Sequence, residues 1–527
     1  MAPKASLFLG VAAATLLAAG SANAQTTLKA VMSTPLRITD PILTTGYTAR
    51  DHGYMVYDTL FATNDKFEVK PQMVKDWSLS DDKLTYTFTL REGLKWHDGQ
   101  PVTTADIIPS IKRWGDRDTM GQKLMDYTKE LAAVDERTFK LVLKEPYGLV
   151  LESLGKVSSN VPFMMPKRLA ETKSVENIPE QIGSGPFKFV QAEFRPGVRT
   201  VYVKNTDYLP RSEPSNWFTG GKVVKLDRVE WVAMPDPNTT LNALINGEID
   251  FIESVPHDLL PLAKAAPGVR TQVHNTLGMI SMLRMNFLHP PLNDKKVRQA
   301  ILHAVSQKDY MDAQVGDPQY YKLCAAIFMC GTPLETNVGS EPLVKKDLAK
   351  ARQLLKEAGY DGSPVVVMHT PDQPTLSPYG PVTEQALRAI GMNVEMIAID
   401  WQTMLSRRAK QDPPTQGGWS IFHTTWVSAD MLNPVMQGGL NARGPKKGGW
   451  FGWADDPEME RLRDEFARTS DPAKQKELAE TIQKRAYDEV MYIIGGLFYQ
   501  VTASRDWTTN WIMAPATVFW NVEKKRT

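Results

Sequence analysis

The sequence predicts an α/β protein with more than one packing unit, and three observations point to it. Residues 226–252 and residues 365–399 each have strand–helix–strand order, which is typical of a parallel crossover. The length of 527 residues is too great for one ordinary domain. A composition of 42% hydrophobic and 23% charged residues is that of a globular chain, neither disordered nor fibrous. Because crossovers occur in both halves with no low-complexity linker between them, we expect the chain to pass between its domains several times.

In the first half, alternation of apolar and polar residues with period two predicts half-buried strands. Thr103 or Thr104 can cap a helix that begins near Ala105. Gly247 ends the helix of the first crossover. The predicted strands are residues 84–90, 139–143, 187–190, 226–234 and 249–252, and the crossover helix is residues 239–246.

In the second half, the clearest helix starts at Asn293 or Asp294. Apolar residues from Val297 to Val305 follow it at the spacing of one buried helical stripe. Another helix begins at Asp347 and stops at a glycine ahead of the second crossover. The remaining predicted elements are strands 365–368 and 394–399 and helices 383–390, 457–468 and 471–487.

Residues 1–24 have the pattern of a secretory signal peptide. Lys4 precedes a short apolar run, and small residues from Ser21 to Ala24 supply a cleavage site before Gln25. The alternative is a buried N-terminal helix. No later stretch reaches the length of a membrane span. We therefore expect an exported, soluble mature protein in the periplasm.

Export affects the interpretation of the only two cysteines, Cys324 and Cys330. An oxidising compartment favours a disulfide between them. A metal site would need more Cys or His nearby, and none lies between Tyr310 and Pro333. A ring this small stabilises the fold by roughly 2 kcal/mol, so we expect a local clamp.

Charge and motifs argue against several functions. Sixty-one Lys and Arg against 60 Asp and Glu give a net charge of +1, so no basic field favours nucleic acid or anionic lipid. Phosphate-binding, dinucleotide-binding, zinc-protease and serine-hydrolase motifs are absent from the sequence. Ser153 and Lys156 have S-x-x-K spacing, but the companion K-T-G and S-D-N motifs are missing. We expect no enzyme activity, no cofactor and no metal site.

Aromatic residues are concentrated late in the chain. Five of the 13 tryptophans fall between residues 401 and 453, in a stretch rich in Gly and Pro. Loops carry binding groups more often than cores do, and aromatic walls suit a cleft for a small molecule. Either these tryptophans line such a cleft or they cover ordinary core. They are Trp401, Trp419, Trp426, Trp450 and Trp453.

Short motifs occur along the chain in a fixed order. They are Tyr57-Asp-Thr-Leu-Phe61, Arg91-Glu-Gly-Leu-Lys-Trp-His-Asp-Gly99, Gly183-Ser-Gly-Pro-Phe187, Leu244-Ile-Asn-Gly-Glu-Ile-Asp-Phe251, Pro291-Leu-Asn-Asp-Lys-Lys-Val-Arg298 and Ala351-Arg-Gln-Leu-Leu-Lys-Glu-Ala-Gly359. With these motifs in this order, the chain resembles the family 5 extracellular solute-binding proteins. These proteins are the receptors of dipeptide, oligopeptide and nickel ABC importers.

The resemblance implies a two-lobe periplasmic-binding-protein fold of the large type II form, with a hinge and a cleft between the lobes. It places the first lobe in residues 25–62, 183–282 and 499–527. Residues 63–182 are expected to form an inserted subdomain of that lobe. The second lobe is expected in residues 283–498.

The resemblance also implies a ligand site. In the family an aspartate just after a tryptophan pairs with the α-amino group of the ligand. Trp426-Val-Ser-Ala-Asp430 is similar, with one residue more between the two. Trp401 corresponds to an aromatic wall of the pocket, and Tyr47 is expected to close it from the first lobe. The alternative for Asp430 is a turn aspartate before Asn433.

The implied function is an extracytoplasmic receptor, expected to act as a monomer, that binds a peptide-like solute and delivers it to an ABC permease in the membrane. Dipeptide receptors also hold the ligand's carboxylate with an arginine, and residues 369–374 contain none. Longer peptides or a non-peptide solute therefore fit better than a dipeptide. A metal chelate, haem or opine receptor is the alternative, with His369 and His423 as metal candidates, and a secreted hydrolase is a third.

Overall fold

The structure is a computed structural model that describes residues 25–525. The predicted signal peptide, residues 1–24, lies outside the described residues. Within residues 25–525, no helix combines the length and the apolar character needed to cross a membrane.

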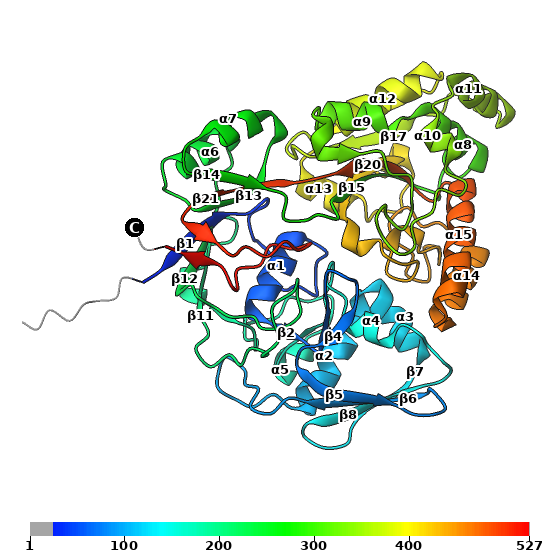
Figure 1. Cartoon of the computed structure of the whole chain (residues 1–527). Helices are drawn as coiled ribbons and strands as arrows, with labels where there is room; N and C mark the ends of the chain where they lie inside the picture. The colour runs from blue at the N-terminus through cyan, green and yellow to red at the C-terminus, as the bar shows by residue number, and fades with distance from the viewer. Residues whose placement is uncertain (1–24, 526–527) are drawn as a thin grey trace, which may run out of the picture.

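A seven-stranded mixed sheet organises one part of the molecule, at the left of Figure 1. Its strand order is β10-β11-β12-β1-β13-β21-β14. The bounds are β1 Thr27–Val31, β10 Phe187–Phe189, β11 Arg199–Lys204, β12 Arg228–Val232, β13 Phe251–Val255, β14 Val269–Gln272 and β21 Val501–Arg505. Three widely separated regions of the sequence therefore meet in this one sheet.

The first predicted crossover is confirmed, with one difference. β12, α6 (Pro237–Ile245) and β13 follow in order, and both strands run parallel to β1. However, the two strands are not neighbours, because β1 lies between them: Ala30 is the register partner of both Trp231 and Phe251. Asp236 caps α6 by accepting from the Thr239 amide.

A six-stranded sheet organises the second part, at the upper right of Figure 1. Its order is β16-β20-β15-β19-β17-β18, and here the second predicted crossover pairs β17 directly with β18. The strand bounds are β15 Met279–Met285, β16 Tyr321–Lys322, β17 Val365–His369, β18 Val394–Ala398, β19 Ile421–Val427 and β20 Ile493–Phe498.

Helices surround this second sheet, and the aspartates expected near their starts do cap them. Asp294, Asp347 and Asp471 each accept hydrogen bonds from backbone amides of the first turn. The helix bounds are α8 Lys295–Ala304, α9 Gln307–Gln314, α10 Glu341–Val344, α11 Leu348–Glu357, α12 Tyr379–Ala389, α13 Trp401–Arg407, α14 Pro457–Arg468 and α15 Pro472–Glu489.

A four-stranded antiparallel sheet with its own helices lies at the bottom of Figure 1. Thr103 caps its longest helix, α2, in a capping box with Asp106. The strands, in the order β5-β6-β8-β7, are Val74–Leu79, Thr85–Leu90, Thr138–Leu143 and Thr128–Ala133. The helices are α2 Thr104–Arg117, α3 Thr119–Tyr127, α4 Val150–Leu154 and α5 Lys167–Ala170.

Shorter elements complete the described chain. They are α1 Tyr47–Val56, α7 Leu260–Ala265, β2 Asp58–Thr59 with β9 Phe163–Met164, β3 Phe61–Thr63 with β4 Val69–Pro71, and β22 Thr508–Thr509 with β23 Glu523–Lys524. The last strand returns to the first sheet, since Lys524 Nζ donates to the Thr27 carbonyl at 2.8 Å.

The chain passes between the two larger sheets at two places, residues 273–278 and residues 499–500. β14 pairs with β21 in one sheet and β15 pairs with β20 in the other, so the two connections run side by side. Met279 and Phe498 are register partners directly beyond them. Gly278 has a φ of +73°, and a Cβ there would meet Leu497 at 2.8 Å, so a larger residue would disturb this junction.

Two of the sequence motifs contact each other and have a structural role. The His97 amide donates to the Gly183 carbonyl at 2.8 Å, and its ring contacts the Gly185 carbonyl at 3.1 Å. A Cβ on Gly183 would lie 2.0 Å from the Val56 carbonyl oxygen at the end of α1. The motifs therefore fix the position of α1, which carries Tyr47 at its other end.

The predicted disulfide is confirmed. Cys324 and Cys330 are joined, with their Cα atoms 6.0 Å apart. The ring lies between β16 and α10, and it stabilises that connection locally.

Candidate functional site

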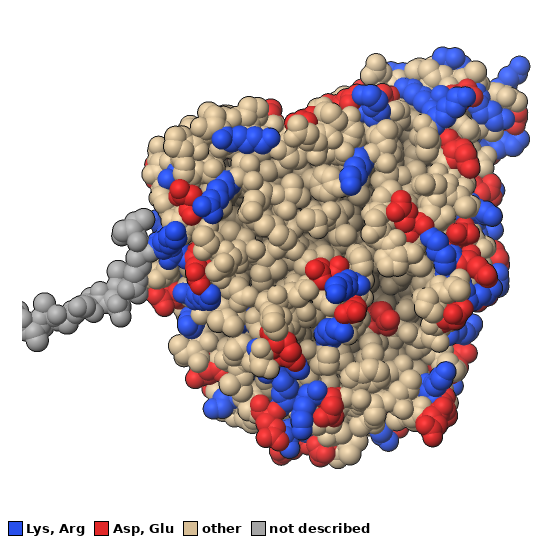
Figure 2. Space-filling view, in the orientation of Figure 1, with Lys and Arg blue, Asp and Glu red and all other residues tan. Residues whose placement is uncertain are grey.

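A large cavity of about 1570 Å³ lies between the two larger sheets. Segments of the first part that line it come from within residues 31–47 and 234–264, and the part with the four-stranded sheet contributes segments from within residues 117–122 and 156–160. Segments of the second part come from within residues 312–320, 372–377, 401–408 and 424–451. Both halves thus supply walls to a single space. In the orientation of Figure 2 a broad uncharged area lies above a small central group of side chains of both signs, and further charged side chains of both signs lie along the rim.

Tyr47 and Asp430 meet at one end of the cavity. Tyr47 is the first residue of α1, and Asp430 ends a short 3-10 helix directly after β19. The Tyr47 hydroxyl donates to Asp430 Oδ2 at 2.9 Å and accepts from the Val427 amide at 2.8 Å. This pair links the two halves of the molecule across the cavity.

The second carboxylate oxygen of Asp430, Oδ1, is buried and has no hydrogen-bond partner among the described residues. Burial raises the pKa of Asp430 above its ordinary value, although the charges of Lys156 and Arg50 act against that rise. A buried acceptor without a partner is costly, so this oxygen is suited to receive a donor from a bound molecule.

Three of the five clustered tryptophans line the cavity, and two belong to the core. Trp401, Trp426 and Trp450 are half-buried at its wall, whereas Trp419 and Trp453 are buried beneath it. Trp426 and Trp450 pack edge to face with ring centroids 5.0 Å apart.

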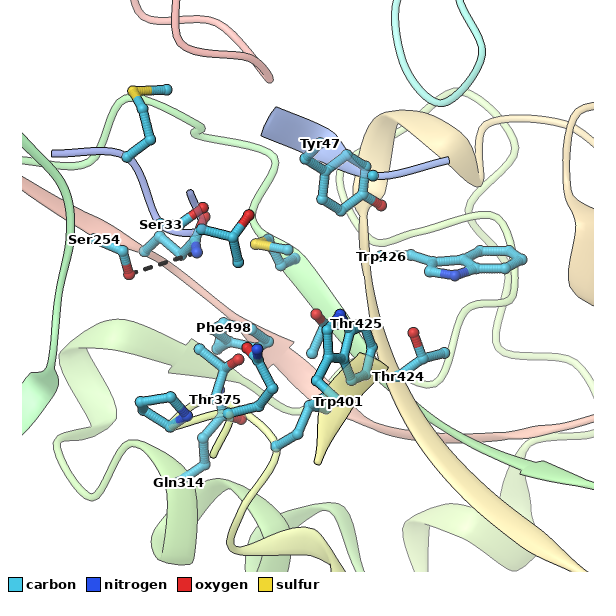
Figure 3. Close-up of a pocket in the computed structure, with 18 of the residues that line it drawn as sticks. Ser33, Tyr47, Ser254, Gln314, Thr375, Trp401, Thr424, Thr425, Trp426 and Phe498 are labelled. Carbon is cyan, nitrogen blue, oxygen red and sulfur yellow. Dashed lines mark hydrogen bonds between the residues drawn. The ribbon is translucent and has the colours of Figure 1, made fainter. Parts of the chain in front are cut away.

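Figure 3 shows Tyr47 and Trp426 on one side of the cavity and Ser33 and Ser254 on the opposite side. Trp401 lies lower in the view, below Thr425. It begins α13, and its amide donates to the carboxylate of Asp372. The Trp401 ring therefore forms a separate part of the wall from the Tyr47–Asp430 pair.

Charges of both signs line the cavity. The basic side chains are Arg117, Lys156, Lys264 and Arg408, and the acidic ones are Asp118, Asp258, Asp312, Asp317, Asp372 and Asp430. Lys156 and Asp118 form a buried ion pair beside the Asp430 end. Mixed charges of this kind favour a zwitterionic solute over a simple anion or cation.

Sequence reasoning missed Lys156 as a lining residue and missed Arg408 altogether. Lys156 appeared only in an S-x-x-K pattern, which pointed to hydrolase chemistry. In the structure its companion Ser153 is buried and shares a hydrogen bond with Tyr147 instead. Arg408 follows Arg407 directly, and nothing in the local sequence distinguishes the two.

The histidines proposed as metal candidates lie away from the cavity lining. His423 is buried, and its Nε2 bonds the Thr383 hydroxyl at 2.8 Å. Burial, together with the neighbouring His369, lowers its pKa to about 3. Across residues 25–525, no group of three or more His, Cys, Asp or Glu side chains could hold a metal ion.

Comparison with known proteins identifies the family. A family model for bacterial extracellular solute-binding proteins, family 5 middle, matches residues 68–447. A probable peptide ABC transporter periplasmic-binding protein of Sinorhizobium fredii is 39% identical over 493 residues, covering 93% of this chain and 92% of the relative. The chain belongs to the family 5 extracellular solute-binding proteins. This family is a class of binding proteins found outside the cytoplasm, not a class of enzymes.

Solved structures show that the family 5 chain has the expected two-lobe fold. A dipeptide-binding protein of Pseudoalteromonas in complex with Met-Leu superimposes with a TM-score of 0.80 at 19% identity, covering 95% of this chain and 100% of that one. The binding protein AgaA of Agrobacterium tumefaciens, in complex with agropinic acid, gives a TM-score of 0.79 at 21% identity, covering 95% and 99%. At these identities the likeness concerns the fold alone.

Proposed function

We propose that this protein is the extracytoplasmic receptor of an ABC importer and captures a peptide or peptide-like solute in the cavity between its lobes. The observation that carries the proposal is Asp430 Oδ1, a buried acceptor without a partner at the wall of a large cavity. A protonated α-amino group would supply both the hydrogen bond and the opposite charge. The name of the Sinorhizobium fredii relative supports a peptide as the solute.

The size of the cavity favours an oligopeptide over a dipeptide. Small-molecule sites have volumes of roughly 300–1,000 Å³, whereas this cavity measures about 1570 Å³. The aromatic wall formed by Trp426 and Trp450 can cover apolar side chains of varied size. The name of the Sinorhizobium fredii relative favours a peptide over a metal chelate.

Capture requires the lobes to move. We assign the first lobe to residues 25–62, 183–278 and 499–525, with residues 63–182 inserted, and the second to residues 279–498. The boundary expected at 282/283 moves to 278/279, because β15 begins at Met279 and belongs to the six-stranded sheet. The two adjacent connections at residues 273–278 and 499–500 would form the hinge. A solute that touches both lobes shifts the equilibrium toward the closed form, which delivers it unchanged to the permease.

Delivery to a membrane permease requires export. Residues 1–24 would direct the chain to the periplasm and be removed there, and the mature protein would act there as a monomer. The Cys324–Cys330 disulfide supports an oxidising compartment.

The experiment that tests the proposal measures binding of tetra-alanine and of N-acetyl-tetra-alanine by calorimetry. Asp430→Asn keeps the size of the side chain but removes its charge, so we expect affinity for the free-amine peptide to fall at least tenfold, or about 1.4 kcal/mol. The acetylated peptide should bind weakly to both proteins. Asp76→Asn, an exposed aspartate of β5 outside the cavity lining, is the matched control and should bind as the wild type does.

Equal affinity of wild type and Asp430→Asn for tetra-alanine would remove Asp430 from the site. Native mass spectrometry of protein purified without denaturation would in addition identify any solute that copurifies. A copurified molecule without an amine would contradict the assignment of Asp430.

A further inference from the structure

Arg50 lies behind the Tyr47–Asp430 pair, in the first turn of α1. A spacing of three residues places Arg50 and Tyr47 on the same face of the helix. The guanidinium lies over the Tyr47 ring, with Cζ 4.6 Å from the ring centroid. The hydroxyl at the far end of that ring donates to Asp430 at 2.9 Å. Arg50 therefore supports the ring that reaches the carboxylate.

The Arg50 side chain is fixed in place and does not face the solute. It is 4% exposed, and it does not occur among the described residues that line the cavity. Nη1 donates to the Ser158 hydroxyl at 2.7 Å, and Nε donates to Asp51 Oδ1 at 2.8 Å. Nη2 lies 2.8 Å from the same oxygen. Any effect of Arg50 on a solute must therefore pass through Tyr47 or Asp430.

The charges around Asp430 determine whether its carboxylate is ionised. Burial raises the pKa of Asp430, and the charges of Lys156 and then Arg50 lower it. Lys156 is already paired with Asp118, which accounts for part of its charge. The titratable and charged groups that face Asp430 are Lys156, with Asp118 behind it, and Tyr47, Arg50 and Tyr54 of α1.

Asp51 balances the charge of Arg50 only in part. Burial raises the pKa of Asp51 well above its ordinary value, against the charge of Arg50, and the nearby Glu253 adds to the rise. Glu253 itself accepts from the Ser33 amide and the Thr517 hydroxyl, each at 2.7 Å, as an ionised carboxylate would. Two carboxyl groups therefore share one cation, and Asp51 is the one that favours the neutral form.

We propose that Arg50 is a positioning residue for amine capture: it holds the Tyr47 hydroxyl against Asp430 and keeps that carboxylate ionised, without touching the solute. The inference rests on the proposed function, because it concerns the same amine contact. Without the cation, Asp430 would take up a proton at a higher pH. A neutral carboxyl group would not pair with a protonated amine.

Calorimetric titration of tetra-alanine across a range of pH tests the inference. In the wild type, affinity should fall as the pH decreases through the pKa of Asp430. In Arg50→Gln, the midpoint of this fall should move to a pH about one unit higher. Arg50→Lys keeps the charge and should restore the wild-type midpoint.

Arg113→Gln is the matched control, because Arg113 also forms a buried ion pair. Its Nη1 and Nη2 donate to Asp40 at 3.1 and 2.7 Å, and Nη2 also donates to the Glu176 carbonyl. This variant should be less stable but should keep the wild-type midpoint. A shift as large as that of Arg50→Gln would overturn the inference, since the loss of any buried cation would then suffice.

An unmoved midpoint in Arg50→Gln would also overturn the inference, even if the affinity falls at every pH, because that is the result for a merely structural arginine. If Arg50→Gln does not fold, Arg50→Gln/Asp51→Asn replaces it, because the double variant leaves no unpaired Asp51. The same upward shift is expected, and an unmoved midpoint has the same meaning.

A measurement on the solute-free protein separates this inference from the proposed function, which fails if tetra-alanine does not bind the wild type. Because burial raises the folded-state pKa of Asp430, its ionisation destabilises the fold. The Tm advantage of Asp430→Asn should therefore grow as the pH rises and level off above that pKa. When Arg50→Gln is also present, the advantage should level off at a higher pH. The same pH dependence in both backgrounds would overturn the inference.

Discussion

Single side chains in this cavity differ chiefly in whether their polar atoms are already satisfied. Asp118 has an ion-pair partner and Asp372 accepts a backbone amide, so neither needs a solute. Asp430 has one satisfied and one unsatisfied oxygen. Under the proposed function, Asp430 is therefore the residue at which the amine of a solute would be recognised.

Asp430 should make binding of an amine solute dependent on pH. Its folded-state pKa is raised by burial, and the amine requires the ionised carboxylate. Affinity for tetra-alanine should consequently decrease as the pH falls through that raised pKa, and Asp430→Asn should bind weakly without this dependence. Calorimetry between about pH 8 and pH 5 measures the effect. A wild-type affinity that rises toward low pH would contradict the sign.

The sequence identified some of these residues and not others, for physical reasons. The family resemblance implies Asp430 and Tyr47, and the structure places them in contact. Arg408 could not be predicted as a lining residue, because it follows Arg407 directly and the local sequence does not distinguish the two. They differ only in the folded structure, where Arg407 donates to the Gly418 carbonyl. Likewise, Trp419 and Trp453 lie in the same tryptophan-rich stretch of the sequence as Trp426, but they are buried in the core.

At the scale of elements, α3 of the inserted subdomain faces α14 of the second lobe through charged side chains (Figure 1). Lys123 is buried there and pairs with Asp464 and Glu460. Arg443 pairs with Asp126 nearby at 2.7 Å. These contacts join the inserted part to the second part, so they stabilise the arrangement of the two parts in this structure.

Lys123→Met should weaken solute binding by several-fold, roughly 1 kcal/mol, because the closed form loses its ion pairs while the contacts in the cavity remain. The radius of gyration of the solute-free protein, measured by small-angle X-ray scattering, should increase. Lys129→Met is the control, because Lys129 is an exposed residue of β7. An affinity and radius equal to those of the wild type would mean that these ion pairs do not affect closure.

Most elements were predictable because their signals are local. A helix cap such as Asp294 or Asp471 is recognised from the few residues that follow it, and so is the apolar spacing of α8. The insertion of β1 between β12 and β13 was not predictable, since the three strands are brought together from distant parts of the chain. Pairing of distant strands leaves no trace in local periodicity.

At the scale of the whole molecule, the cavity depends on the relation between two lobes. Trp401, Trp426 and Trp450 line it, so their surroundings change when the lobes close on a solute. We expect intrinsic tryptophan fluorescence to change on binding, with a smaller change in Trp426→Phe. Identical spectra with and without a peptide shown to bind by calorimetry would contradict the aromatic wall.

The register pairing of Met279 with Phe498 has a consequence for protein engineering. The stretch from 279 to 498 leaves and re-enters the rest of the protein at neighbouring points, so it forms a cassette with adjacent ends. Exchanging this cassette between homologous receptors would require only two junctions. We expect such chimaeras to combine the Tyr47 side of one protein with the Asp430 side of another, and so to assign each half of solute selectivity to its own gene segment.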